Sequence, residues 1–215
     1  MAVIPFYGAS HPELFGIERA AMDRPGRVIE HLHARLPEWG LVVDIGAGDG
    51  HTVELLQRSE RQIVPVEPSV EMIHSRGRTT LSWVRGDAAR LPFKSGAFQG
   101  AYATWAYFFS RDWDPTPGLN ELHRVVEPGG PLLIVDNLGS DEFTALASTD
   151  ITADPGYWAD RGFGCEVIDT CFEFETLDDA RRLLGLYFGH AGTAGAATRL
   201  NYRVGLFHGR SRGPS

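Results

Sequence analysis

The segment Asp44-x-Gly46-x-Gly48-x-Gly50 constrains the fold more than any other part of this sequence. Its first two residues end a largely apolar run at residues 41–45, which is typical of a buried strand, and an amphipathic helical pattern follows the last glycine. Glycines spaced by two allow the backbone to turn tightly and to approach a ligand without Cβ clashes. A strand, a glycine turn and a helix in succession predict an α/β fold with a ligand at the turn.

Strands and helices alternate along the rest of the chain. Because crossovers between parallel strands are right-handed, such segments build one doubly wound sheet with helices on both faces. We therefore predict an α/β fold of the Rossmann-like kind, a three-layer sandwich around a seven-stranded, mostly parallel sheet. The expected strands are residues 41–45, 63–67, 81–85, 98–103, 132–135, 164–174 and 202–208. Helices are expected at residues 25–36, where Val28 and Ile29 fall at helical spacing, at 69–75 with Ser69 as N-cap, and at 176–188 with Thr176 and Asp179 as a capping pair.

The length of 215 residues, with 43% hydrophobic residues, suits one domain with one sizeable core. We expect that domain to span residues 1–208, with a lid-like N-terminal segment at 1–24. Residues 137–160 are rich in Gly, Ser, Thr, Asp and Pro and predict a variable connection on the substrate side. Residues 209–215 are expected to form a disordered tail.

The formal net charge of -8, with Lys and Arg scattered, makes nucleic acid an unfavourable partner. No leader pattern and no apolar run of membrane-spanning length is found, so we expect a cytoplasmic protein without a membrane partner. The histidines lack partners at ligand spacing, and no required metal is predicted. A monomer or a weak homodimer is expected.

The spacing and charge of the glycine turn separate two classes of ligand. A dinucleotide site needs Gly-x-Gly-x-x-Gly, whose third glycine would fall at His51 or Val53 here. A pyrophosphate also favours a neutral turn, whereas Asp44 and Asp49 make this one acidic. S-adenosylmethionine, which carries a sulfonium, an ammonium and no phosphate, fits this turn better than NAD.

Two further carboxylates end neighbouring strands. Glu67 stands 17 residues beyond Gly50, where a doubly wound fold brings a carboxylate beside the ribose of a ligand. Asp87 follows the third expected strand, where it could accept a hydrogen bond from an adenine amino group. The alternative for each is a solvated strand end, but their joint placement favours one nucleoside site.

Four motifs, in order and at suitable spacing, resemble the small class I S-adenosylmethionine-dependent methyltransferases often labelled type 11. They are Val43–Gly50, Glu67–Met72, Gly86–Ala88 with Leu91–Phe93, and Glu127–Gly130. The resemblance covers about residues 40 to 136. It implies that Gly46–Gly50 holds the methionyl part, Glu67 the ribose, Asp87 the adenine amino group and Ala88 the ring through its backbone, with Met72 packed on the adenine.

The remaining candidates rest on position. Asp136, at the end of the fifth strand, and His11 are candidates for a general base, although a turn cap and a solvated loop residue are their ordinary roles. Tyr7 could donate to the carboxylate of the cofactor from the lid-like segment. The full set of expected cofactor-binding residues is Tyr7, Asp44, Gly46, Ala47, Gly48, Gly50, Glu67, Pro68, Met72, Asp87, Ala88, Thr104 and Trp105.

The function expected from the sequence is methyl transfer from S-adenosylmethionine to a small-molecule acceptor, with S-adenosylhomocysteine as product. Two alternatives stay open. One is a non-catalytic protein that binds S-adenosylmethionine, and the other is a nicotinamide-dependent oxidoreductase, which the spacing and acidity of the turn disfavour.

Overall fold

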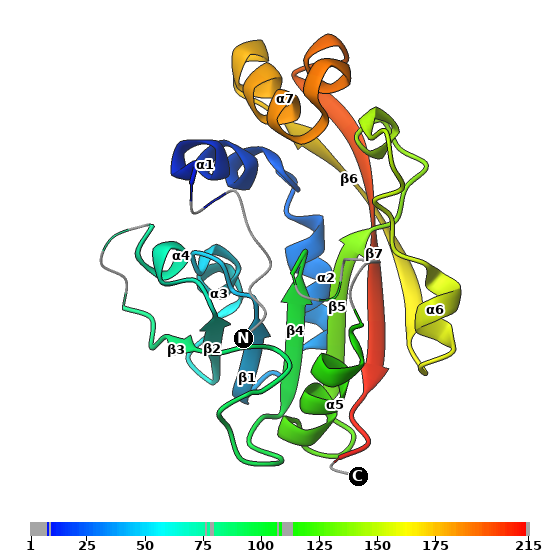
Figure 1. The fold of residues 1–215 in the computed structure, drawn as a ribbon. Helices are drawn as coiled ribbons and strands as arrows, with labels where there is room; N and C mark the ends of the chain where they lie inside the picture. The colour runs from blue at the N-terminus through cyan, green and yellow to red at the C-terminus, as the bar shows by residue number, and fades with distance from the viewer. Residues whose placement is uncertain are drawn as a thin grey trace.

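A computed structural model describes residues 8, 10–75, 77, 80–106, 108 and 114–213. Over these residues the chain forms a seven-stranded sheet with the strand order β3-β2-β1-β4-β5-β7-β6 (Figure 1). The strands are β1 (Gly40–Ile45), β2 (Arg61–Glu67), β3 (Val84–Arg85), β4 (Gly100–Thr104), β5 (Pro131–Asn137), β6 (Gly164–Glu173) and β7 (Arg199–Arg210).

Five strands pair in parallel, and the last strand in the chain reverses the direction. The β1, β2, β3, β4 and β5 strands run the same way, while β7 is antiparallel to both β5 and β6. The predicted doubly wound, mostly parallel sheet is confirmed. Because the carboxyl ends of neighbouring parallel strands meet at one edge, the segments after β1, β2, β3 and β4 lie close together.

Helices cover both faces of this sheet. The helices are α1 (Pro12–Ala21), α2 (Arg27–Arg35), α3 (His51–Leu56), α4 (Val70–His74), α5 (Thr116–Val125), α6 (Pro155–Ala159) and α7 (Leu177–Ala194), with a 3-10 helix, η2, at Thr144–Leu146.

Two separate hydrophobic clusters show the three layers. Val42 packs with residues of α1, α2, α3 and α7, whereas Val43 packs with residues of α5 and α6. Successive side chains of a strand point to opposite faces, so these neighbours belong to the two interfaces of a three-layer sandwich. The predicted layering is confirmed.

Local signals placed several helix ends correctly. The Ser69 hydroxyl accepts a hydrogen bond from the Met72 amide at 3.2 Å and caps α4, as predicted. The Thr176 hydroxyl accepts from the Asp179 amide at 3.0 Å and caps α7. The α7 helix runs further than predicted, to Ala194, with a non-helical residue at Gly189.

The disordered tail predicted at residues 209–215 is wrong at its start. The β7 strand continues to Arg210, and Ser211 is buried. The Ser211 amide donates to the Gly130 carbonyl at 2.9 Å, and its hydroxyl reaches the Val126 carbonyl at 2.9 Å. These bonds fix the chain after β7 to the end of α5, a long-range contact that local sequence does not reveal.

No helix of the described residues is long and apolar enough to cross a membrane.

A buried arginine fixes the far end of the helix that follows the glycine turn. Arg61, at the start of β2, is 1% exposed. Its guanidinium donates to the Leu56 carbonyl, with Nε at 3.1 Å, and to the Pro37 carbonyl at 3.1 Å. Leu56 is the last residue of α3, so Arg61 satisfies a carbonyl that the helix itself leaves unpaired.

Replacing this arginine is expected to destabilise the protein. Arg61→Met should lower the free energy of unfolding by about 2–3 kcal/mol, because the buried Leu56 carbonyl and the partly buried Pro37 carbonyl lose a charged donor. Denaturant titration followed by circular dichroism measures the change. The exposed Arg58→Met provides the matched control, and an equal, small effect of both variants would contradict the role assigned to Arg61.

Candidate functional site

The glycine turn between β1 and α3 is held against the end of β2. The amides of Gly46 and Ala47 both donate to the Val66 carbonyl, at 2.9 and 3.1 Å. Gly46 has φ 74°, and a Cβ there would lie 2.5 Å from the Ala106 Cβ. Only glycine fits this position, because a side chain would be both strained and in collision with the segment after β4.

Glu67, the last residue of β2, completes the attachment of the turn. One of its carboxylate oxygens accepts from the Gly48 amide at 3.0 Å, and the other accepts from the Ser69 amide at 2.9 Å. Burial raises the pKa of the Glu67 carboxyl, and these two hydrogen bonds oppose the rise. Each oxygen keeps lone-pair capacity for another donor, so Glu67 can hold the turn and also accept from a ligand.

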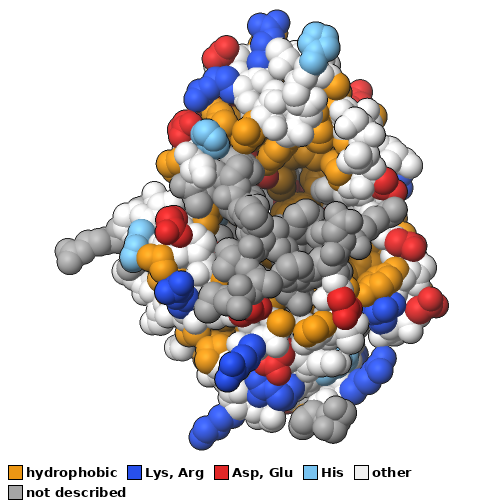
Figure 2. Space-filling model, viewed as in Figure 1, with side chains coloured by type: hydrophobic (Ala, Val, Ile, Leu, Met, Phe, Trp, Pro, Cys, Tyr) orange, Lys and Arg blue, Asp and Glu red, His pale blue; other side chains and the backbone are white. Residues whose placement is uncertain are grey.

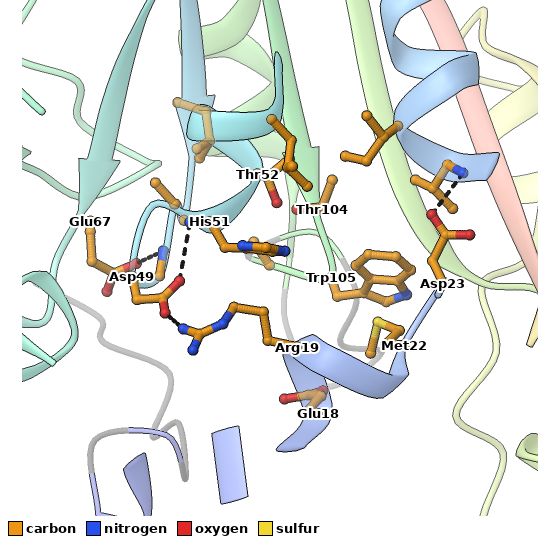
Figure 3. A pocket seen from close by; sticks show the side chains of 18 of the residues that line it. Glu18, Arg19, Met22, Asp23, Asp49, His51, Thr52, Glu67, Thr104 and Trp105 are labelled. Carbon is orange, nitrogen blue, oxygen red and sulfur yellow. Dashed lines mark hydrogen bonds and ion pairs between the residues drawn. The ribbon is translucent and has the colours of Figure 1, made fainter. Parts of the chain in front are cut away.

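An ion pair fastens α1 over the turn. Arg19 of α1 pairs with Asp49, whose carboxylate is 2% exposed and also accepts from the His51 amide at 3.1 Å (Figure 3). The sequence predicts a lid-like segment at residues 1–24 but not this pairing of Arg19. No local pattern could have identified it, because the two residues lie 30 positions apart in the chain.

Asp44 lies beneath the turn and is completely buried. Neither of its carboxyl oxygens has a hydrogen-bond partner among the described residues. Burial raises the pKa of Asp44 to about 8, the neighbouring Tyr102 hydroxyl opposes the rise, and the charge of Glu67 adds to it. At neutral pH the carboxyl therefore holds its proton in most molecules.

The acidic turn is thus less negative than its sequence indicates. Asp44 is uncharged while it holds its proton, and the negative charge of Asp49 is balanced by Arg19. In the ligand-free protein, a cationic ligand would therefore meet a protonated Asp44 and an Asp49 that is already paired.

A cavity of about 770 Å³ opens at the turn, within the size range of small-molecule sites. Figure 2 shows hydrophobic side chains around a hollow beside α1 on the face seen in Figure 1. Nine of the predicted cofactor-binding residues line the cavity: Gly46, Ala47, Gly48, Glu67, Pro68, Asp87, Ala88, Thr104 and Trp105.

Other predicted residues lie elsewhere. Asp44 and Met72 are buried behind the turn and do not line the cavity, and Met72 is 1% exposed. Gly50 does not line the cavity either, and a Cβ there would lie 2.5 Å from Leu81 Cδ1. Tyr7 lies outside the described residues.

Neither candidate base lines this cavity. Asp136 is buried and accepts from the Asn137 amide at 2.7 Å, and burial raises its pKa to about 7. The His11 side chain is 48% exposed and lies 3.8 Å from Glu13. Their roles in proton transfer stay predictions, and the geometry of the described residues does not support them.

Residues 22–26 and 28–30 form one wall of the cavity, and the sequence had assigned only those up to residue 24 to a lid-like segment. Asp23 adopts a left-handed backbone with φ 50°, and its carboxylate accepts from the Val28 amide at 2.9 Å and the Thr170 hydroxyl at 2.6 Å. Met22, Val28 and Ile29 add apolar surface. The helical spacing of Val28 and Ile29 predicted a buried face but not the cavity that it borders.

Trp105, directly after β4, is held by a chain of hydrogen bonds. Its indole nitrogen donates to the Tyr202 hydroxyl at 2.6 Å, and Tyr202 donates to the Asn137 amide oxygen. Asn137 in turn donates to the Ile151 carbonyl at 3.0 Å. Trp105 has φ 44°, a strained conformation of the kind that clusters at functional sites.

Comparison with known proteins supports a methyltransferase. Residues 43–134 match the family model described as "Methyltransferase domain". A demethylmenaquinone methyltransferase from Beutenbergia cavernae is 36% identical over 120 residues, which are 54% of this chain and 48% of that protein. The ubiquinone/menaquinone biosynthesis C-methyltransferase UbiE from Rubrivivax gelatinosus is 29% identical over 44% of this chain and 38% of that protein. The chain therefore spans less than half the length of these curated relatives.

Solved structures share the fold over most of the chain. A SAM-dependent methyltransferase from Thermotoga maritima has a TM-score of 0.59 at 20% identity and covers 95% of this chain and 96% of its own. The geranyl diphosphate C-methyltransferase from Streptomyces coelicolor A3(2) has a TM-score of 0.55 at 15% identity, over 87% of this chain and 80% of its own. The resemblance to class I S-adenosylmethionine-dependent methyltransferases, inferred from the motifs, is confirmed.

The buried Asp44 carboxyl should make stability depend on pH. Its pKa is about 8 in the folded protein against 3.8 for an aspartate in water, so the folded state binds more protons between these values. The contribution to stability is complete below the lower value and is lost as the pH rises through about 8. Relative to the parent, Asp44→Asn should gain at least about 2 kcal/mol in free energy of unfolding between pH 5 and pH 8.

Urea titrations of the ligand-free protein at pH 5, 6, 7 and 8 measure this difference. The exposed Asp160→Asn serves as the control and should leave the pH profile unchanged. A difference between Asp44→Asn and the parent that stays constant over this range would show that Asp44 is ionised throughout.

Proposed function

We propose that this chain, with its class I methyltransferase fold and a methyltransferase domain over residues 43–134, is an S-adenosylmethionine-dependent methyltransferase of a small molecule. The observation that carries the proposal is the cavity at the carboxyl ends of β1, β2 and β4, which contains both the glycine turn and Glu67. Ligands of doubly wound sheets bind at this edge, where the strand order reverses.

The residues of the cavity fit an extended nucleoside with an amino-acid tail. Glu67, with its remaining lone pairs, would accept from the two ribose hydroxyls, and Asp87 from the adenine amino group. The backbone at Ala88 would lie along the ring. The turn at Gly46–Gly48 leaves no room for a Cβ at Gly46 and presents main chain to the methionyl part.

Asp44 supports the same ligand from below the turn. A buried carboxyl without a hydrogen-bond partner among the described residues lowers the stability of the fold, and a group of this kind calls for a functional explanation. A cationic ligand above the turn would favour its ionised form, so binding and loss of the Asp44 proton would assist each other. Met72, which is buried on the far side of Gly48, would support the turn from behind.

When bound, S-adenosylmethionine supplies an electrophilic methyl group on a sulfonium. Displacement at that methyl group needs the attacking atom in line with the leaving sulfur, and alignment alone accounts for much of such rate enhancements. The chain contributes the orientation through Glu67 and the turn. It excludes water through α1, which Arg19 holds in place over Asp49.

Two alternatives are separated by binding and turnover. Tight binding of S-adenosylhomocysteine with no response to NADH in calorimetry would exclude the nicotinamide-dependent oxidoreductase. Formation of S-adenosylhomocysteine from S-adenosylmethionine in the presence of a panel of small acceptors would exclude a non-catalytic binding protein. Binding of NADH and not of S-adenosylhomocysteine would overturn the proposal. A small-molecule acceptor, no nucleic-acid partner, and a monomer or weak homodimer complete the proposed function.

Glu67 provides the sharpest test of the cofactor site. Glu67→Ala should weaken S-adenosylhomocysteine binding by roughly 1–3 kcal/mol, because the ribose hydroxyls and the Gly48 amide lose their acceptor. Calorimetric titration measures the dissociation constant, and circular dichroism verifies the fold. Glu60→Ala, an exposed site just before the same strand, is the matched control. Equal affinities of Glu67→Ala and the parent would remove Glu67 from the site.

A further inference from the structure

The cavity continues well past the turn that would hold the cofactor. Figure 3 shows Glu67 on one side of the pocket and Trp105 and Asp23 on the other. The part farther from Glu67, here called the distal compartment, is bordered by Met22, Asp23, Val28, Ile29, Leu55 and Trp105. It lies between the α1–α2 link, the first turn of α2, the α3 helix and the end of β4.

We propose that the distal compartment binds the methyl acceptor, and that this acceptor is a flat, largely apolar compound bearing an uncharged or positively charged nitrogen. Compounds that carry a carboxylate or a phosphate are disfavoured. The inference rests on the proposed methyltransferase function and extends it to the class of substrate.

The charged side chains that line the cavity favour a cationic or neutral acceptor over an anionic one. Among the described residues, six carboxylates and two arginines line the cavity, and the pairing of Arg19 with Asp49 removes one of each, which leaves five carboxylates against one arginine. A cavity of low dielectric concentrates such a field, so it attracts cations and repels anions more strongly than an open surface does. The six carboxylates are Glu18, Asp23, Glu30, Asp49, Glu67 and Asp87, and the second arginine is Arg24.

The shape and composition of the wall form the second argument. Trp105 is fixed by its hydrogen bond to Tyr202 and cannot turn away without breaking it. Indole faces attract cations and stack on flat rings. Met22, Val28, Ile29 and Leu55 complete an apolar surface that suits the body of such a compound.

The movement of charge during the reaction favours the same class. An acceptor that binds as its ammonium first loses one proton to water. The lone pair of the resulting uncharged nitrogen then forms the new bond to the methyl carbon, and the electrons of the carbon–sulfur bond stay on sulfur. One positive charge thereby passes from sulfur to nitrogen, and a proton on that nitrogen then leaves to water. The carboxylates of the cavity stabilise the developing positive charge, whereas an anionic acceptor would first have to enter against them.

Three probes that differ only in the charge of one group test the proposal. Tryptamine, tryptophol and indole-3-propionate share the indole ring and a two-carbon chain, which ends in an ammonium, a hydroxyl and a carboxylate. Calorimetry on the protein saturated with S-adenosylhomocysteine should show tryptamine binding at least about tenfold more tightly than indole-3-propionate, with tryptophol between them.

Two variants test whether this order of affinities arises in the distal compartment. Trp105 is also one of the residues that the sequence assigned to the cofactor, so its effects on the two ligands are compared: Trp105→Leu should weaken tryptamine binding at least about fivefold more than it weakens S-adenosylhomocysteine binding. Glu30→Gln, which removes one charge from the wall, should reduce the preference for tryptamine over indole-3-propionate by about two- to fivefold. The exposed Glu175→Gln on the segment before α7 should leave the preference unchanged.

Equal or tighter binding of indole-3-propionate would overturn the proposal, and so would the failure of all three probes to bind at millimolar concentration. A drop in S-adenosylhomocysteine affinity in Trp105→Leu as large as the drop for tryptamine would assign Trp105 to the cofactor instead. Failure of the parent protein to bind S-adenosylhomocysteine at all would be a different result, since it would refute the proposed function itself.

Discussion

The site depends on the attachment of the glycine turn to the end of β2. Three consecutive amides of the turn, at Gly46, Ala47 and Gly48, donate to β2 through the Val66 carbonyl and the Glu67 carboxylate. Side-by-side pairing of β1 and β2 brings these groups together, and the glycines allow the backbone to come close enough. The carboxylate proposed to hold the ribose, that of Glu67, is therefore the same group that shapes the turn. A ligand bound to Glu67 would also affect the geometry of the turn.

The charges at the turn are compensated in the ligand-free protein. Asp44 retains a proton because it is buried, and Asp49 is paired with Arg19 from α1. Both arrangements reduce the cost of placing carboxylates in a desolvated position. They also mean that a cationic ligand meets groups able to respond to it, because its arrival favours ionisation of Asp44.

Sequence reasoning succeeded where a local pattern decides the structure. The strand–turn–helix unit, the caps at Ser69 and Thr176 and the sheet of seven strands all follow from short-range signals and from the chirality of crossovers. Contacts between distant segments were not predictable in this way. Arg19 on Asp49 and Ser211 on the end of α5 join residues whose proximity exists only once the fold is formed.

The two sides of the cavity come from different parts of the chain, and this division explains why the cofactor was easier to infer than the acceptor. The turn, Glu67 and Asp87 all fall within residues 43–134, the segment that matches the methyltransferase domain. The distal compartment is built largely from residues 22–30, and the Tyr202 and Asn137 side chains that fix Trp105 come from β7 and β5. Tyr202 and Asn137 both lie outside residues 43–134. The shape and charge of the proposed acceptor site are therefore set largely by elements outside the matched domain. A shared cofactor motif is consequently compatible with acceptors as different as those named for the relatives, and the acceptor has to be argued from the wall around Trp105.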